Sequence, residues 1–130
     1  MRYLLDTDTV SYALRGEGQV AGRITAHKPS ELCISAISLA ELRYGADRKG
    51  SRRLHALINT FATALEVVGF AEEAALEFGR IGTILAERGT PIGEFDVLIA
   101  AHAASLRCTL VTNNLRHFSK VPGIAVENWK

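Results

Sequence analysis

The sequence predicts an α/β fold with a central, mostly parallel sheet. Short apolar runs alternate along the chain with longer segments whose apolar residues recur at helical spacing. The run Tyr3-Leu4-Leu5 is apolar at consecutive positions, as expected of a strand buried on both faces of a parallel sheet. The chain has 130 residues, of which 48% are apolar and 22% charged, and this composition suits one compact domain.

Each element follows from its local pattern. Strands are expected over residues 2–6, 31–35, 65–68 and 108–112, with a short last strand within 124–129. Helices are expected over residues 7–14, 17–27, from Ser38 onwards, 51–63, 71–88 and 94–106. The helix over 71–88 has the clearest signal, because its apolar residues recur at helical spacing and Gly89 stands where a helix-ending glycine belongs.

Charge and cysteine content exclude several classes of protein. Fifteen Lys and Arg against fourteen Asp and Glu give a net charge of +1, so any affinity for nucleic acid must come from a local patch. Cys33 and Cys108 form no C-x-x-C pair, which excludes a zinc knuckle and a thiol redox motif. We expect both cysteines to be buried and reduced. The sequence indicates neither a signal peptide nor a membrane span, so we expect a cytoplasmic protein without a membrane partner.

Three acidic residues are the candidate catalytic and metal-binding groups. Asp6 ends the first strand, Glu41 lies in the first turn of the helix after the second strand, and Asp96 lies in the first turn of the helix over 94–106. Ligands of open α/β sheets bind beyond the carboxyl ends of the strands, where these acids would meet. Crowded carboxylates repel one another, and a hard dication such as Mg²⁺ or Mn²⁺ relieves the repulsion. The chemistry indicated is metal-dependent hydrolysis of a phosphoryl group or a phosphodiester.

Each acid also has a purely structural interpretation. Ser38-x-x-Glu41 fits a capping box, Asp6 could cap the following helix, and Asp96 is a residue type that helix N-termini favour. The glycine at position 45, one turn beyond Glu41, favours the functional interpretation. A glycine inside a helix costs about 1 kcal/mol relative to alanine, and this cost is understandable if a ligand must approach there.

Further polar and basic residues complete the candidate site. The residues expected to orient water or phosphate are Thr7, Asp8, Thr112, Asn113 and Asn114. The residues expected to hold a polyanion backbone are Arg43, Arg48, Lys49, Arg52 and Arg53, although a charge run of this kind also fits a solvated face. Of the four histidines, only His117 is placed to reach the site.

Four segments together resemble the PIN-domain ribonucleases, and most closely the VapC-type toxins of bacterial toxin–antitoxin pairs. These segments are LLDTDTVSYALR, ISAISLAELRYGA, GTPIGEFDVLIAAHA and TLVTNNLRHF, and the chain ending PGIAVENW continues the similarity. The resemblance implies one PIN domain over residues 1–130, built as a three-layer α/β/α sandwich around the parallel sheet. In that family the three acids correspond to Asp6, Glu41 and Asp96.

The resemblance also implies an activity and partners. PIN-domain ribonucleases hold Mg²⁺ or Mn²⁺ and cut RNA, and relatives of this subgroup cut a tRNA in its anticodon stem-loop. They are neutralised by a cognate antitoxin, and many form homodimers. Two departures bear on the number of metal ions: Asp8 stands where many members have Asn, and Asn113 and Asn114 stand where many PIN domains have a fourth acid.

Two other interpretations stay open from the sequence. Asp6-Thr7-Asp8-Thr9-Val10 fits the opening motif of haloacid-dehalogenase-like phosphatases, with Asp6 as the nucleophile. Those enzymes need a lysine and a pair of aspartates downstream of the residue matching Thr112, and no Asp follows that position here. A non-catalytic binding module, whose acids only cap helices, is the second alternative.

Overall fold

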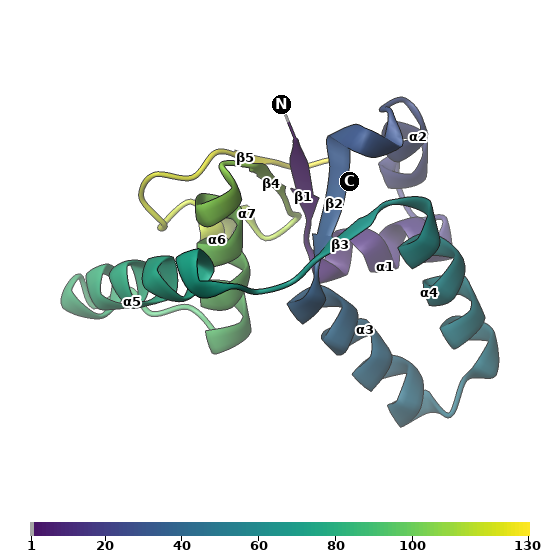
Figure 1. Cartoon of the computed structure of the whole chain (residues 1–130), viewed down its shortest axis with the longest axis horizontal. Coiled ribbons are helices and arrows are strands. Elements are labelled where there is room, and N and C mark those ends of the chain that lie inside the picture. The colour runs from purple at the N-terminus through teal and green to yellow at the C-terminus, as the bar shows by residue number, and fades with distance from the viewer. Residues whose placement is uncertain (1) are drawn as a thin grey trace.

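The computed structural model of the chain describes residues 2–130 and contains a five-stranded sheet in which every strand pairing is parallel (Figure 1). The strands are β1 (Tyr3–Leu5), β2 (Leu32–Ser35), β3 (Glu66–Val68), β4 (Thr109–Val111) and β5 (Val126–Glu127), in the order β3-β2-β1-β4-β5. The strand order reverses between β1 and β4, so the carboxyl ends of these two neighbours open the crevice in which such sheets bind ligands.

Helices cover both faces of the sheet. They are α1 (Thr7–Arg15), α2 (Val20–Thr25), α3 (Ala36–Lys49), α4 (Arg52–Ala64), α5 (Glu72–Glu87), α6 (Glu94–Leu106) and α7 (Leu115–Phe118), with a single 3₁₀ turn, η1 (Pro29–Glu31). Figure 1 shows α5, α6 and α7 on one side of the sheet and α1 to α4 on the other. The expected three-layer arrangement is confirmed. No helix within residues 2–130 has the length and apolar character needed to cross a membrane.

Alternation along the strands produces two separate hydrophobic clusters. Leu4 of β1 faces the α5–α6 side, where it packs with Ile81 and Phe118. Leu5, its neighbour, faces the opposite side and packs with Val10 and Ile58. Successive strand residues point to opposite faces of a sheet, so a strand buried on both faces must be apolar at consecutive positions. The two clusters together fix the sheet between two helical layers.

The start of α3 differs from the prediction and changes the interpretation of Glu41. Ser35, at the end of β2, caps the helix by accepting a hydrogen bond from the amide of Ile37, whereas Ser38 is buried inside the helix. The helix therefore begins at Ala36, and Glu41 lies in its second turn and not in its first. The Ser38–Glu41 capping box is wrong, because the N-cap is Ser35 and the box would require Ser38 at that position.

Other differences concern short or weakly patterned segments. The helix expected over 17–27 is limited to α2, because Gly18 adopts a left-handed backbone at φ +63° and delays its start. The four-residue helix α7 was not predicted, because it is too short to show a period. Cys33 and Cys108 are both buried and unpaired by a disulfide, as predicted, and the fold places them in the same hydrophobic cluster.

Candidate active site

Asp6 forms the buried floor of the site at the end of β1. Its Oδ1 atom accepts a hydrogen bond of 2.8 Å from the amide of Thr9, so Asp6 caps α1, and its side chain also hydrogen-bonds to that of Thr112 after β4. Only 6% of Asp6 is exposed. Burial raises the pKa of Asp6, and the charge of Asp8 adds to this, while the bonds from Thr112 and Thr9 oppose the rise. The expected role of Asp6 as the cap of α1 is confirmed. Its carboxylate also lies at the crevice between β1 and β4, so capping is not its only possible role.

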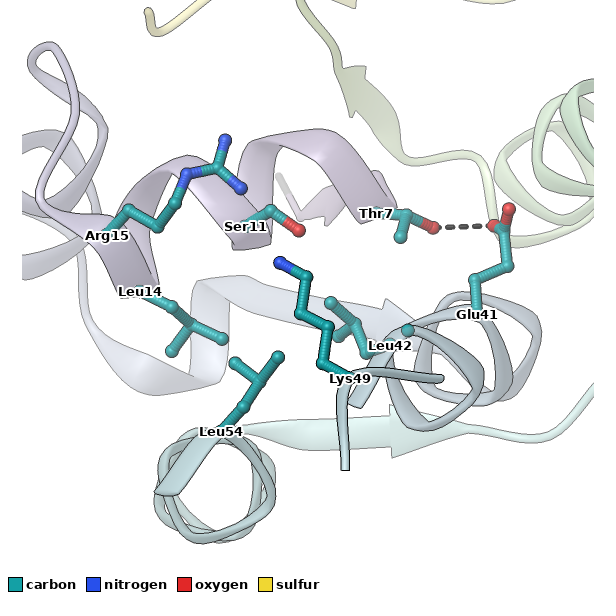
Figure 2. Close-up of a pocket in the computed structure, with 9 residues that line it drawn as sticks. Thr7, Ser11, Leu14, Arg15, Glu41, Leu42, Lys49 and Leu54 are labelled. Carbon is teal, nitrogen blue, oxygen red and sulfur yellow. Dashed lines mark hydrogen bonds between the residues drawn. The ribbon is translucent and has the colours of Figure 1, made fainter. Parts of the chain in front are cut away.

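Glu41 reaches the same region from α3. Its Oε1 atom accepts a hydrogen bond of 2.6 Å from the hydroxyl of Thr7, in the first turn of α1 (Figure 2). Burial raises the pKa of Glu41, the Thr7 bond lowers it, and the negative charges of Asp96, Asp8 and Asp6 raise it further. Asp6, Asp8 and Asp96 are therefore close enough to Glu41 for their charges to affect it.

Asp96 is held from the C-terminal part of the chain. It lies in the first turn of α6, and its Oδ2 atom is 3.0 Å from Nδ1 of His117 in α7. Asn114 caps α7, because its side chain accepts a hydrogen bond from the amide of His117. The side chain of Asp96 is 32% exposed, so it is more open to solvent than Asp6. The prediction that His117 reaches the site is confirmed.

The acids approach one another without forming a closed set of ligands. Within residues 2–130, no group of three or more His, Cys, Asp or Glu side chains is placed so that it could hold one ion. Among the described ion pairs, neither Asp6 nor Glu41 has a Lys or Arg partner. Asp8 is exposed, on the turn of α1 that also carries Thr7. Within residues 2–130, the candidate carboxylates thus have no Lys or Arg partner, and His117 is the ion-pair partner of Asp96.

The polar residues after β4 divide into two groups. The Thr112 hydroxyl accepts a hydrogen bond from the amide of Asn114, which leaves its proton for Asp6. Asn113 is exposed, and its amide contacts the Tyr12 hydroxyl at 3.4 Å and the Asn128 side chain at 3.2 Å. Thr112 therefore belongs to the floor of the site, and Asn114 supports it through α7. The contacts of Asn113 are with α1 and the C-terminal segment.

A groove leads away from the acids between α1 and α3 (Figure 2). Thr7 and Glu41 lie at one end, and Arg15 and Lys49 extend over the middle, with a hollow of about 160 Å³ between them. Its apolar walls are Leu14, Leu42 and Leu54. The groove continues along the start of α4, where Arg53 and Leu57 line it. Gly45 lines it, and a Cβ atom there would meet nothing within 4 Å, so the glycine widens the groove without any packing need.

Arg43 is occupied by contacts within the protein. One guanidinium nitrogen donates to Nδ1 of His55 at 3.0 Å and to the His55 carbonyl at 3.3 Å, and the other donates to the side chain of Asn59. His55 in turn donates from Nε2 to Asp47 at 2.8 Å. These bonds join α3 to α4. By contrast, Arg48 and Arg52 are exposed.

Sequence reasoning did not identify three features of the site. The bond from Thr7 to Glu41 joins residues 34 positions apart, and the pairing of Asp96 with His117 depends on how α7 packs. Tyr44 and Phe95 are exposed aromatic residues beside two of the acids, and they line a hollow with Thr7, Ala40 and Glu41. A signal for these aromatics was present, because Tyr44 follows Glu41 by three positions, less than one helical turn, and Phe95 directly precedes Asp96.

Comparison with known proteins identifies the family. The family model described as "PIN domain" matches residues 3–124. The tRNA(fMet)-specific endonuclease VapC of Salmonella typhimurium is 38% identical over 99% of this chain and 98% of that protein. Ribonuclease VapC2 of Haemophilus influenzae (strain Rd) is 37% identical over the same shares.

Solved structures agree with this result. The DNA-bound VapBC of Salmonella typhimurium contains a chain that superposes with a TM-score of 0.94 at 37% identity, with 100% of this chain and 99% of that chain covered. The promoter-bound VapBC2 of Rickettsia felis gives a TM-score of 0.93 at 32% identity, with both chains fully covered. The chain belongs to the PIN-domain family, and its similar relatives there are VapC ribonucleases.

Proposed function

We propose that this protein is an endoribonuclease that hydrolyses phosphodiester bonds in RNA, tRNA included, and acts as the toxin of a toxin–antitoxin pair. The observation that carries the proposal is that Asp6 follows β1 at the crevice between β1 and β4, and Thr7 beside it donates a hydrogen bond to Glu41. Burial and then the charges of Asp96, Asp8 and Asp6 raise the pKa of Glu41, which supports a site shared by these acids. Relatives named as VapC ribonucleases match nearly the whole chain, which does not favour the phosphatase or the non-catalytic alternative.

The donor set fits a hard divalent cation, and we propose Mg²⁺ or Mn²⁺. Carboxylate oxygens are the ligands that both ions prefer, and Asp6 and Glu41 lack a Lys or Arg partner among the described residues. Asp6, Glu41 and Asp96 would hold the ion. When bound, such an ion polarises the phosphodiester and lowers the pKa of water.

The protein's own side chains would position these three carboxylates. Thr9 and Thr112 hold Asp6 in place at the strand end, so it needs no reorganisation when substrate arrives. Thr7 fixes Glu41 against α1, and His117 fixes Asp96 against α7. Each acid therefore has at least one partner that sets its orientation, as an electrostatic site organised in advance of the reaction requires.

The groove between α1 and α3 is our proposed path for the RNA backbone. Arg15, Lys49 and Arg53 line it and its continuation, and it starts at Thr7 and Glu41. Arg48 and Arg52 are exposed nearby and would add to the local positive potential. We assign Arg43 to the joining of α3 and α4, because its guanidinium is already bonded to His55 and Asn59.

We propose further that a cognate antitoxin, a homodimer and the cytoplasm complete the biological setting. The solved relatives of Salmonella typhimurium and Rickettsia felis are named VapBC and are bound to DNA, and the latter is bound to a fragment of its own promoter. Cys33 and Cys108 are buried free thiols, which fits a reducing compartment.

The proposal is tested by RNA cleavage with purified protein. Bulk tRNA is incubated with Mg²⁺ or Mn²⁺, and the fragments are end-mapped. We expect Asp96→Asn to lose activity by about 100-fold or more while keeping its fold, because it removes one charge that the ion needs. Glu87→Gln, which likewise removes one negative charge but at an exposed position of α5, is the control. Full activity of Asp96→Asn, or of the wild type in excess chelator, would refute the mechanism.

A second readout is growth of a bacterial host. We expect expression of the wild type to arrest growth and expression of Asp6→Ala at an equal level to have no effect. Equal arrest by both proteins would show that toxicity does not come from this site.

A further inference from the structure

Two exposed aromatic side chains flank the acids. Tyr44 on α3 is 66% exposed, and Phe95 in the first turn of α6 is 55% exposed. An aromatic ring left in water forgoes the stabilisation that burial of its apolar surface would provide. Two such rings at one position of a folded protein indicate a binding surface more strongly than scattered single residues do.

Both rings open onto one hollow at the active site. Its lining consists of Thr7, Ala40, Glu41, Tyr44 and Phe95, and it encloses about 620 Å³. Small-molecule sites typically measure roughly 300–1,000 Å³. The polar end of the hollow is the hydrogen-bonded pair of Thr7 and Glu41, and its walls are aromatic and aliphatic. Among residues 2–130, the ring contacts do not include one between Tyr44 and Phe95, so the two rings face a shared space without stacking on each other.

The hollow differs from the groove on the other side of Glu41. The groove carries Arg15 and Lys49, which suit phosphates, whereas the hollow presents aromatic faces and no cation among its lining residues. Single-stranded RNA has both kinds of surface, a charged backbone and flat apolar bases. A phosphate placed at the acids would therefore leave its neighbouring base on the aromatic side.

We propose that Tyr44 and Phe95 form a stacking site for an unpaired nucleobase next to the scissile phosphate. The inference rests on the proposed ribonuclease function and adds to it the form of substrate, namely RNA whose bases are unstacked at the cleavage position. Stacking is tolerant of base identity because every base has an aromatic face, so the site selects for single-stranded RNA more than for sequence. Leu76, the most exposed large apolar side chain, lies on α5 and does not line the hollow.

The test uses the full-length protein and a synthetic RNA that spans a cleavage position mapped in bulk tRNA. Tyr44→Leu and Phe95→Leu keep apolar bulk but remove the ring, and Tyr44→Phe keeps the ring. We expect each Leu variant to raise KM by about 5- to 150-fold, which corresponds to 1–3 kcal/mol of stacking, and Tyr44→Phe to stay within about 2-fold of the wild type. Leu76→Ala is the matched control at a distant exposed apolar position.

A modified substrate makes the test specific for base stacking. Replacing one base beside the scissile phosphate by an abasic residue should raise the KM of the wild type by about the same factor as the Leu substitutions do. In the Leu variant that has lost the ring contacting this base, the abasic substrate should raise KM little further. Unchanged KM in both Leu variants, or full additivity at both flanking positions, would overturn the stacking site.

Two other outcomes are distinguishable. If the Leu variants lower the molecular mass in sedimentation while KM stays that of the wild type, the aromatic pair serves an interface between copies of this chain, and the inference is wrong. If the wild type fails to cleave RNA with Mg²⁺ or Mn²⁺, or Asp96→Asn cleaves normally, the proposed ribonuclease function itself fails.

Discussion

The floor and the rim of the active site are built differently. The floor consists of Asp6 with its partners Thr9 and Thr112, at the ends of the adjacent strands β1 and β4, and it is buried. The rim consists of long side chains on helix surfaces, such as Lys49 in the groove and exposed Tyr44 in the hollow. Backbone topology positions the floor, whereas helix packing positions the rim. The difference suggests that the floor determines the chemical step and the rim determines which RNA is bound and how.

The largest effect is expected on the floor. Asp6→Asn keeps a side-chain oxygen that can accept the Thr9 amide, so α1 remains capped and the fold is retained. The lost charge should lower kcat by about 100-fold or more, equivalent to about 2.7 kcal/mol, with KM changed little. Single-turnover cleavage measures both constants. If the variant instead raised KM and left kcat unchanged, Asp6 would contribute to RNA binding, like the rim, and not to the chemical step.

Arg43 is expected to act on stability, although it lies among the basic residues of the rim. Arg43→Ala removes bonds to His55 and Asn59 that join α3 to α4, and hydrogen bonds to a charged group are worth about 1.5–3 kcal/mol each. Urea unfolding should show a loss of about 1–3 kcal/mol. Arg48→Ala removes the same charge from an exposed position and should stay within about 0.5 kcal/mol of the wild type. Equal stability of the two variants would contradict this assignment.

The cationic part of the rim should determine the salt dependence of binding. Each contact with a phosphate of single-stranded RNA contributes about −0.7 to the slope of log K against log salt. Lys49→Ala and Arg53→Ala should each make the slope less steep by about this amount, while kcat at saturating RNA is unchanged. Fluorescence anisotropy with a labelled RNA over a range of salt concentrations provides the measurement. An unchanged slope in both variants would remove the groove from the RNA path.

The smallest effect concerns the carboxylate that joins floor and rim. Burial is the main effect that raises the pKa of Glu41, and the charges of Asp96, Asp8 and Asp6 raise it further. The hydrogen bond from Thr7 lowers it, but the net change is a rise. The folded state therefore holds this proton more tightly than the unfolded chain does, and its contribution to stability is lost as the pH rises through the raised pKa.

Glu41→Gln removes that charge while keeping an acceptor for the Thr7 hydroxyl. Without divalent metal we expect its Tm to exceed that of the wild type at pH 7.5, and the difference to shrink below about pH 4, where Glu41 is protonated in both states. Thermal melting at the two pH values checks this. A lower Tm for the variant at pH 7.5 would show that Glu41 is not crowded by negative charge.

The sequence was sufficient to predict the features that short-range patterns encode. The helix over 94–106 coincides with α6, and the strand–helix alternation correctly gives the parallel sheet. The predicted start of α3 at Ser38 is wrong because two serines, Ser35 and Ser38, can both cap a helix. The structure selects Ser35, because β2 ends there and the helix follows directly.

Features that depend on packing between distant segments could not be predicted. That Asp96 pairs with His117 depends on the packing of α7, a helix too short to have a sequence signal. Arg43 has the composition of a nucleic-acid contact, and nothing local shows that α4 brings His55 and Asn59 within its reach. The sequence predicts Asp6, Glu41 and Asp96 as one group from sheet topology, and their joint role stays a prediction. The structure places Asp6 at the end of β1 and Asp96 in the first turn of α6, whereas Glu41 lies in the second turn of α3.

Isothermal titration calorimetry of Mn²⁺ binding to the purified protein at pH 7.5 tests the shared carboxylate site most directly. We expect the wild type and Glu87→Gln to bind the ion with the same affinity, and Asp6→Asn and Asp96→Asn each to bind it at least about 10-fold more weakly. Equal affinity in all four proteins would contradict a metal site formed jointly by acids from β1 and α6.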